Sequence, residues 1–286
     1  MLSNEEIQFI KKNAYIPEHL LDYVISVSEA TPFLYTNYLF YLKDGFLTFI
    51  GYSLNEKFES EEIKEVLNYV VSQYKPKSVA LISPFFIIPQ DECIESESDF
   101  YYRIDLSNFR ISSKLKNSIN RAKREVEIEK TNYITDEHIS LIDEFVKLRQ
   151  IDDYRKYIFY KIQNYLENSN TVQVYNAINS KGKLVAFDVA DYGAEKYAFY
   201  MFNFINRRFY VPGVSDLLLY NIIETAIKQK KYYLNLGLGI NKGVVFFKKK
   251  WEGYPFLRHE FCFYNVKVEK KFSIKKFFKK LFQKLY

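Results

Sequence analysis

The sequence predicts a mixed α/β fold of the α+β kind, built on one mixed sheet. Aromatic, alternating runs typical of half-buried strands recur along the chain, with helical segments between them. The stretch 197–253 combines strand, turn, helix, strand and basic segment in one crossover. A crossover implies two parallel strands, whereas short turns between strands imply antiparallel pairs. The 286 residues, 48% hydrophobic and 27% charged, suffice for one large domain or two of ordinary size.

The first half of the chain predicts a hairpin, a helix and a buried strand. The strands 38–42 and 46–51 flank Lys43-Asp44-Gly45, which is a hairpin signal. The helix that follows has one apolar face, formed by Ile63, Val66, Leu67, Val70, Val71 and Tyr74. After Pro76 the apolar run 78–83 is typical of a buried strand. The acidic segment 91–99 predicts a loop, and 100–106 predicts another strand.

The second half predicts a meander that leads into the crossover. Its expected elements are a basic helix at 113–124, a strand at 126–130, helices at about 136–149 and 153–168, and strands at 172–178, 184–192 and 197–204. The helix of the crossover follows 211–213, and its second strand is 232–236. This order predicts antiparallel strands joined to one parallel unit.

The turn inside the crossover has the features of an anion site. Val-Pro-Gly at 211–213 breaks the chain, and Ser215 and Asp216 then offer N-cap chemistry before an apolar helical run. A helix that begins at a sharp turn has unpaired N–H groups that attract anions, and Arg207 and Arg208 come just before it. A pyrophosphate would suit this place. The alternative is an ordinary β-α-β unit with solvated arginines.

These segments, in this order and spacing, resemble the GNAT superfamily of N-acyltransferases. The residues that carry the resemblance are the arginine-rich turn, the strand ending in Asn235-Leu236-Gly237-Leu238-Gly239, and then Phe247-Lys248 and Trp251-Glu252-Gly253. The sequence looks most like the divergent branch with the Fem-type aminoacyltransferases of peptidoglycan cross-bridges and the catalytic domain of phosphatidylglycerol lysyltransferase. The basic helix at 113–124 is similar to the helix that opens the catalytic half of those proteins. The likeness covers 112 to about 264.

The resemblance implies two tandem GNAT-like halves, with a degenerate N-terminal half at 1–110 and a catalytic half at 111–266. It implies an N-acyltransferase that moves an acyl or aminoacyl group by direct attack of an amine. The donor would be acyl-CoA (acetyl-CoA or longer) or aminoacyl-tRNA, held where the sheet splays between its parallel strands. Typical acetyl-CoA users have a Q/R-x-x-G-x-G/A loop, of which 208–214 supplies only part. The alternative is therefore a catalytically inactive GNAT-like binding or scaffold protein.

Candidate catalytic residues follow from what N-acyl transfer needs. The amine must be neutral, the developing oxyanion needs donors and the leaving group needs a proton. No nucleophile set is visible, so a covalent intermediate is not expected. Candidate bases are Asp188, Asp191 and Glu224, with Tyr200, Asn203 and Asn235 lining the cleft. Each also has a structural interpretation, as a solvated carboxylate, a core tyrosine or a buried amide that needs a partner.

Candidate donor-binding residues come mainly from the resemblance. It implies that backbone N–H groups from Phe202 to Phe204 polarise the acyl carbonyl. Lys248 of the Phe-Lys motif is a candidate to bind phosphate or carboxylate, and the alternative is a solvated lysine. The helix start would hold the donor through Arg207, Arg208, Val211, Gly213, Val214 and Ser215. The basic helix could offer an anionic substrate or donor the side chains of Lys116, Asn120, Arg121 and Arg124. A solvated basic face is the alternative for these residues.

Several classes of site and location are disfavoured. Cys93 and Cys262 stand alone, as do His19, His138 and His259, so the sequence predicts neither a metal site nor a structural disulfide. No helix-turn-helix with base-reading residues is visible, which makes DNA an unexpected partner. The acidic N-terminus is followed by no long apolar core, so we expect neither a signal peptide nor a membrane span, and a cytoplasmic protein.

The basic charge is concentrated at the C-terminus. The segment 267–286 holds eight lysines and one glutamate, whereas the whole chain has a formal net charge of only +6. The rest of the chain is therefore close to neutral. Apolar residues recur there at helical spacing, which predicts a basic amphipathic helix. It would bind an anionic membrane surface at the inner face, bind RNA such as tRNA, or pack on the domain. The acceptor of the transfer would be a small-molecule amine, a peptide or an aminolipid.

Overall fold

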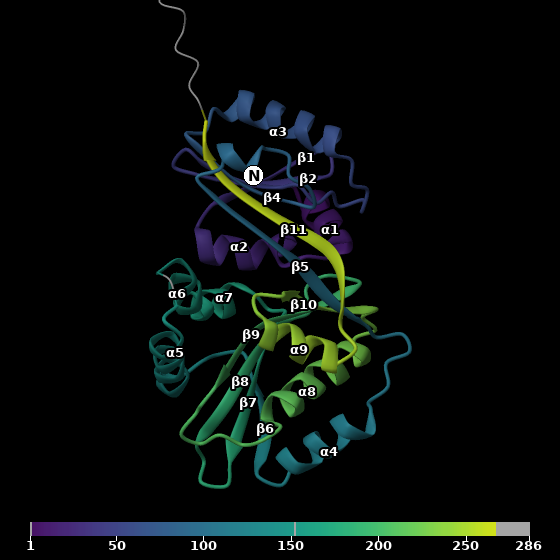
Figure 1. Cartoon of the computed structure of the whole chain (residues 1–286), viewed down its shortest axis with the longest axis vertical. Coiled ribbons are helices and arrows are strands. Elements are labelled where there is room, and N and C mark those ends of the chain that lie inside the picture. Colours follow the sequence, from purple (N-terminus) through teal and green to yellow (C-terminus); the bar gives the residue numbers. More distant parts are fainter. Residues whose placement is uncertain (1, 152, 267–286) are drawn as a thin grey trace, which may run out of the picture.

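A computed structural model of the chain describes residues 2–151 and 153–266. Within these ranges, eleven strands form one mixed sheet in the order β1-β2-β3-β4-β11-β5-β10-β9-β8-β7-β6. Helices pack against it in two halves that are stacked along the long axis of the molecule (Figure 1). The predicted mixed α/β class is confirmed. The amphipathic helix predicted at 267–286 lies outside the described residues.

The first half contains the predicted hairpin, helix and strand. Its elements are α1 (Asn4–Asn13), η1 (Pro17–His19), α2 (Leu21–Ser28), β1 (Thr31–Tyr35), β2 (Tyr38–Lys43), β3 (Phe46–Ile50), α3 (Ser60–Tyr74) and β4 (Ser78–Ser83). The hairpin turns at Gly45, where φ is 82°, a value that glycine adopts without strain. β3 then pairs in parallel with β4, since α3 carries the chain back across the sheet.

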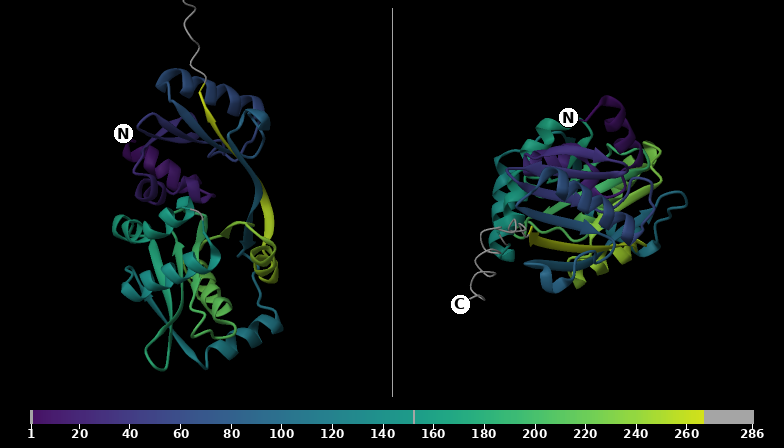
Figure 2. Two further views of the ribbon diagram at one scale, coloured as in Figure 1. Left: turned by 60° about the vertical axis from the view of Figure 1, so that its left-hand side comes forward. Right: turned by 90° about the horizontal axis from the view of Figure 1, so that it is seen from above.

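Two long strands, β5 (Glu95–Asp105) and β11 (Tyr254–Asn265), run through both halves (Figures 1 and 2). β11 pairs antiparallel with β5 and, at its far end, with β4. The loop predicted for 91–99 is therefore wrong from Glu95 onward, although the short η2 (Gln90–Glu92) precedes the strand. Glu95, Glu97 and Asp105 of β5 are exposed and Asp99 is half-buried, so most of this charge faces solvent and does not oppose strand pairing.

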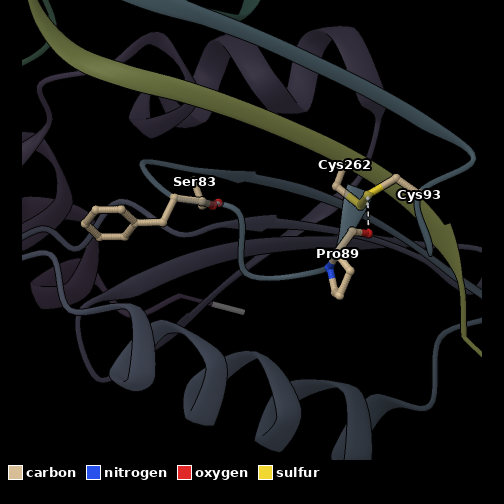
Figure 3. Close-up of a disulfide and its surroundings, with 5 residues drawn as sticks. Ser83, Pro89, Cys93 and Cys262 are labelled. Carbon is tan, nitrogen blue, oxygen red and sulfur yellow. Dashed lines mark hydrogen bonds between the residues drawn. A yellow bond between two sulfur atoms is a disulfide. The ribbon is translucent and has the colours of Figure 1, made fainter. Parts of the chain in front are cut away.

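The two cysteines are joined across this strand pair. Cys93 lies in the loop before β5 and Cys262 lies on β11, with the two Cα atoms 5.5 Å apart and a sequence separation of 169 (Figure 3). Cys93 Sγ also lies 3.5 Å from the Pro89 carbonyl oxygen. The prediction of no disulfide was wrong. The two residues meet only because β11 returns beside the start of β5, and no local spacing indicates this return.

The second half contains a four-stranded meander with helices on both faces. Its elements are α4 (Ser113–Ala122), β6 (Val126–Thr131), α5 (Asp136–Arg149), α6 (Asp153–Tyr160), α7 (Ile162–Asn168), β7 (Val172–Asn179), β8 (Leu184–Asp191), β9 (Tyr197–Ile205), α8 (Val214–Lys228), β10 (Tyr233–Leu238) and α9 (Lys242–Lys250). The helix predicted at 153–168 is interrupted at Lys161, where φ is −87° and ψ is 1°. The side chain of Lys161 pairs with Glu29 of the first half.

Three apolar clusters position the site. One lies between the sheet and α4 and α8, and another lies between the opposite sheet face and α5 to α7. The third joins the halves, because Tyr15 and Ile16 of the N-terminal segment pack with Tyr101, Tyr197 and Phe199. None of the described helices combines the length and apolar character that crossing a bilayer requires.

Candidate functional site

The parallel strands β9 and β10 separate after three residue pairs. They pair at Tyr233 with Tyr197, Leu234 with Ala198, and Asn235 with Phe199. Beyond Phe199, β9 continues on β8 alone, while β10 continues on β5. We call the opening between them the β9–β10 wedge. The predicted splaying of the sheet between its parallel strands is confirmed.

A bulge in each strand marks the wedge. In β9 the register against β8 shifts at Met201, which is the extra residue between Tyr200 and Phe202. In β10 the register against β5 shifts at Leu236, directly after the last residue that pairs with β9. Bulges bend a strand and increase its local twist. The two strands therefore diverge because both are irregular at the same level.

Three predicted site residues, Asp188, Asn203 and Tyr200, lie on the adjacent strands β8 and β9. Asp188 on β8 is fully buried opposite Asn203, whose side-chain amide donates to its Oδ1. Burial raises the pKa of Asp188 to about 8, although Asn203 and Tyr200 lower it. Its Oδ2 receives no hydrogen bond from the described residues. A carboxyl group with such a pKa keeps a proton near neutral pH and can exchange it.

Tyr200 lies on β9, the strand between Asp188 and the wedge. Burial and the nearby carboxyl of Asp188 hold the pKa of Tyr200 well above its ordinary value. Asp216 of α8 acts on this pKa in the same direction. Tyr200 therefore stays a neutral hydroxyl, which can both donate and accept a hydrogen bond.

Lys248 is buried under the end of β10. Only 3% of it is exposed, and its Nζ donates to the Leu238 carbonyl oxygen. Burial lowers the pKa of Lys248 to about 7, against the effect of Asp99. The Phe-Lys pair is placed by α9, whose N-cap Asn241 accepts from the backbone of Gly243 and Val244. The helix thus holds an amine that titrates near neutrality beside β10.

The start of α8 is built around a glycine. Gly213 is the N-cap with φ 87°, and a Cβ there would lie 2.5 Å from the Ser118 carbonyl oxygen. The N-cap chemistry predicted for Ser215 and Asp216 is wrong, because the helix already begins at Val214. No side chain caps the first turn, so its N–H groups keep the character of an anion site.

The first turn of α8 also carries a buried carboxylate. Asp216 is 4% exposed and accepts from Ser118 Oγ at 2.6 Å and Trp251 Nε1 at 3.1 Å. Lys250 pairs with it at 2.5 Å. These contacts tie α4 and the end of α9 to the start of α8. Because Lys250 pairs with the carboxylate, its negative charge is compensated within the network. The sequence gives no sign of the network, since its members are far apart in the chain.

The other predicted residues lie outside this cluster. Asn235 donates to the Tyr15 carbonyl oxygen and accepts from the backbone of Gly237, so it closes the β10 bulge. Glu224 accepts from Tyr220 along α8. Asp191 closes the turn after β8, where it accepts from Tyr165, Thr171 and Gly193. The remaining set is divided between exposed side chains (Lys116, Asn120, Arg121, Arg124, Arg207 and Arg208), the half-buried Ser215, and buried apolar ones (Phe202, Phe204, Val211 and Val214).

Two hollows lie away from the wedge. One is lined by residues that include His19, Asp22 and Asp191, and the other includes Asp22, Glu29 and Asn164. Both lie between the N-terminal helices and the second half. The features that make the β9–β10 wedge the candidate site are therefore its strand geometry and its buried polar groups. In the described ranges, no group of three or more His, Cys, Asp or Glu side chains could hold a metal ion.

No protein-family model matches the sequence, and no curated protein matches it either. Solved structures show the same fold. L-PGS from Bacillus licheniformis is 14% identical with a TM-score of 0.59, over 94% of this chain and 93% of that one. FemX is 10% identical with a TM-score of 0.56, over 93% and 96%. A tandem GNAT protein from the clavulanic acid biosynthesis pathway is 10% identical with a TM-score of 0.53, over 82% and 79%. The chain has a tandem GNAT-like fold.

Proposed function

We propose that this chain is an acyltransferase of the GNAT type, which transfers an acyl or aminoacyl group from an activated donor to an amine. The observation that carries the proposal is the β9–β10 wedge, which has the buried Asp188 and Lys248 on its two sides. Each of these groups has a pKa moved toward neutrality by burial. Titratable groups perturbed in this way are concentrated at functional sites.

The reaction would proceed by direct attack. The donor carbonyl would lie in the wedge, where the backbone N–H groups between Phe202 and Phe204 stabilise the developing oxyanion. The amine lone pair forms the C–N bond, and the carbon–oxygen or carbon–sulfur bond to the leaving group breaks. The amine loses its proton to Asp188 through Tyr200, with Asp188 in its ionised form. Lys248 in its charged form contacts a phosphate or the developing negative charge on the leaving group. The leaving group takes up a proton from water and Asp188 returns the proton of the amine to water, so that one proton passes in total from the amine to the leaving group.

Two kinds of activated donor suit the proposed site. The donor would be acyl-CoA (acetyl-CoA or longer) or aminoacyl-tRNA, and its phosphate would lie beside the network of Asp216 with Ser118, Trp251 and Lys250 at the start of α8. The acceptor would be a small-molecule amine, a peptide or an aminolipid. A cytoplasmic location, with 267–286 on the inner membrane surface, remains part of the proposal.

A second candidate function is a binding or scaffold protein without catalysis. It is favoured by the same network, because Ser118, Lys250 and Trp251 already satisfy the carboxylate at the place where a donor phosphate would bind. In this case no donor would be turned over. The two functions differ in whether ligand binding is followed by transfer.

Thermal unfolding with coenzyme A, acetyl-CoA, longer acyl-CoAs and aminoacyl-tRNA tests both candidates, followed by mass spectrometry of an amine acceptor mixture. A donor should raise the melting temperature and give an acylated product. Lys248→Met should abolish the product, whereas Lys249→Met, at the exposed neighbouring position on α9, should not. Stabilisation without product in any mixture would support the scaffold function. If no donor stabilises the protein and no acylated product forms, the acyltransferase proposal is contradicted.

A further inference from the structure

Arg103 lies at the narrow end of the wedge, on the sheet face opposite Lys248. On β5 it pairs with Asn235 of β10, whose partner on β9 is Phe199, the last shared pair. The preceding Tyr102 has its ring 5.6 Å from Lys248 Nζ. Successive side chains of a strand point to opposite faces. The wedge therefore has one cation on each face, Lys248 on the α9 side and Arg103 on the other.

Three aromatic rings surround the Arg103 guanidinium. Its Cζ lies 4.2 Å from the ring centre of Tyr233, 4.7 Å from that of Phe256 and 5.5 Å from that of Tyr254. Nε donates to the Tyr254 hydroxyl at 2.9 Å, and Nη1 donates to the Tyr197 hydroxyl at 2.6 Å. The rings and hydroxyls fix the plane of the group, so little side-chain freedom remains to be lost on binding a ligand.

No carboxylate of the described residues lies within ion-pair distance of Arg103. A guanidinium has five N–H donors, and the described residues accept two of them. Arg258 offers the contrast. It lies 5.7 Å from the ring centre of Phe86, but its Nε is paired with Glu260. Arg103 thus keeps donors in the fork geometry that binds carboxylate or phosphate.

Both neighbouring strands are irregular beside Arg103. β10 carries its bulge after Asn235, and β11 carries one after Pro255, close to Tyr254, which pairs with Arg103. The extra residue in β11 is Phe256, one of the three rings around the guanidinium. Bulges of this kind re-aim side chains and recur next to active sites. The Arg103 guanidinium is flanked by the buried Tyr197 on one side and by Tyr254, which is 39% exposed, on the other. Solvent therefore reaches the guanidinium on the Tyr254 side.

We propose that Arg103, in this aromatic frame, binds an anionic group of the acyl acceptor, a carboxylate or a phosphate. The inference rests on the proposed function, in which the donor occupies the α8 and α9 side of the wedge near Lys248. The acid group of the acceptor then binds on the opposite face, where the Arg103 guanidinium lies beside Tyr197 and Tyr233, the first shared pair of β9 and β10. Holding an acid group there orients the amine for attack. The site selects acceptors that carry an acid group as well as the reacting amine.

Arginine Nε–H resonances of the wild-type full chain, titrated with sodium phosphate and separately with sodium acetate at constant ionic strength, test the binding step. The Arg103 resonance is identified by its loss in Arg103→Lys. It should shift saturably across the millimolar range with at least one anion, and the two salts distinguish phosphate from carboxylate. Arg258→Met is the matched control and should leave this titration unchanged. No saturable shift with either anion would overturn the proposal.

Kinetics separate this inference from the proposed function. With an anionic acceptor, Arg103→Lys should raise KM about tenfold with little change in kcat, because it keeps the charge and loses the fork. An acceptor without an acid group should show no such rise. Turnover with no saturable anion shift and an unchanged KM would refute the Arg103 site alone. A saturable shift without turnover of any donor would refute the acyltransferase and leave the anion site standing.

Discussion

The side-chain amide of Asn235 donates to the carbonyl oxygen of Tyr15 at 2.7 Å, across 220 residues of sequence. Its Oδ1 accepts from the backbone of Gly237, also at 2.7 Å. One residue therefore closes the β10 bulge and fixes the N-terminal segment against the strand at the wedge. Asn235 was predicted as a catalytic residue, but both the nitrogen and the oxygen of its side-chain amide make structural hydrogen bonds.

Replacement of Asn235 by Ala should lower the free energy of unfolding by about 2–4 kcal/mol, because it leaves the buried Tyr15 carbonyl and the half-buried Gly237 N–H without this partner. Urea unfolding measures the change. Asn168→Ala is the control, since its amide donates to Asn164 at the surface, and should cost less than about 1 kcal/mol. Unchanged stability with loss of transfer would instead assign Asn235 to the reaction.

Asp188 should make the wild-type protein less stable as pH rises. Its folded pKa is about 8, above the ordinary value of 3.8, so the folded state holds a proton that the unfolded state has lost. The stabilisation is full below about pH 4 and is lost by about pH 8, with a slope of up to about 1.4 kcal/mol per pH unit. Asp188→Asn should remove this pH-dependent contribution to the free energy of unfolding. Denaturant unfolding of both proteins from pH 5 to pH 9 compares the slopes, and parallel curves would refute the pKa assignment.

Lys248 should have the opposite effect in a higher pH range. Its folded pKa of about 7 is below the ordinary 10.5, so the unfolded state holds the extra proton and stability increases with pH from about 7 to about 10.5. The difference in unfolding free energy between wild type and Lys248→Met, measured from pH 7 to pH 9, should grow in favour of wild type. Lys249→Met serves as the exposed control. A difference that does not vary with pH would mean that Lys248 titrates normally.

The local elements of this fold could be predicted from sequence because each has a local cause. Alternation defines β9, the Val-Pro-Gly turn precedes α8, and Lys43-Asp44-Gly45 gives the first hairpin. The wedge followed from resemblance in the order of these elements. Asp188, Tyr200 and Asn203 were predicted as candidates, and the structure brings them together because β8 and β9 are adjacent.

What could not be predicted depends on strand order across the whole sheet. β11 lies between β4 and β5, far from its neighbours in sequence. That position places Tyr254 and Phe256 around Arg103, and no pattern near Arg103 announces it. The Asp216 network has the same origin, since Ser118 and Trp251 reach it from α4 and from the end of α9.

The same strand order creates the Cys93–Cys262 disulfide, which closes a loop of 169 residues. Cross-linking a loop of this length restricts the unfolded chain, so the Cys93→Ser, Cys262→Ser double variant should lose about 2–5 kcal/mol of unfolding free energy. Reductant should lower the melting temperature of wild type and leave that of the double variant unchanged. Equal melting of wild type with and without reductant would contradict the disulfide. Transfer activity of the folded double variant should persist, because the disulfide fixes the far end of β11, whereas Tyr254 at its near end contacts Arg103.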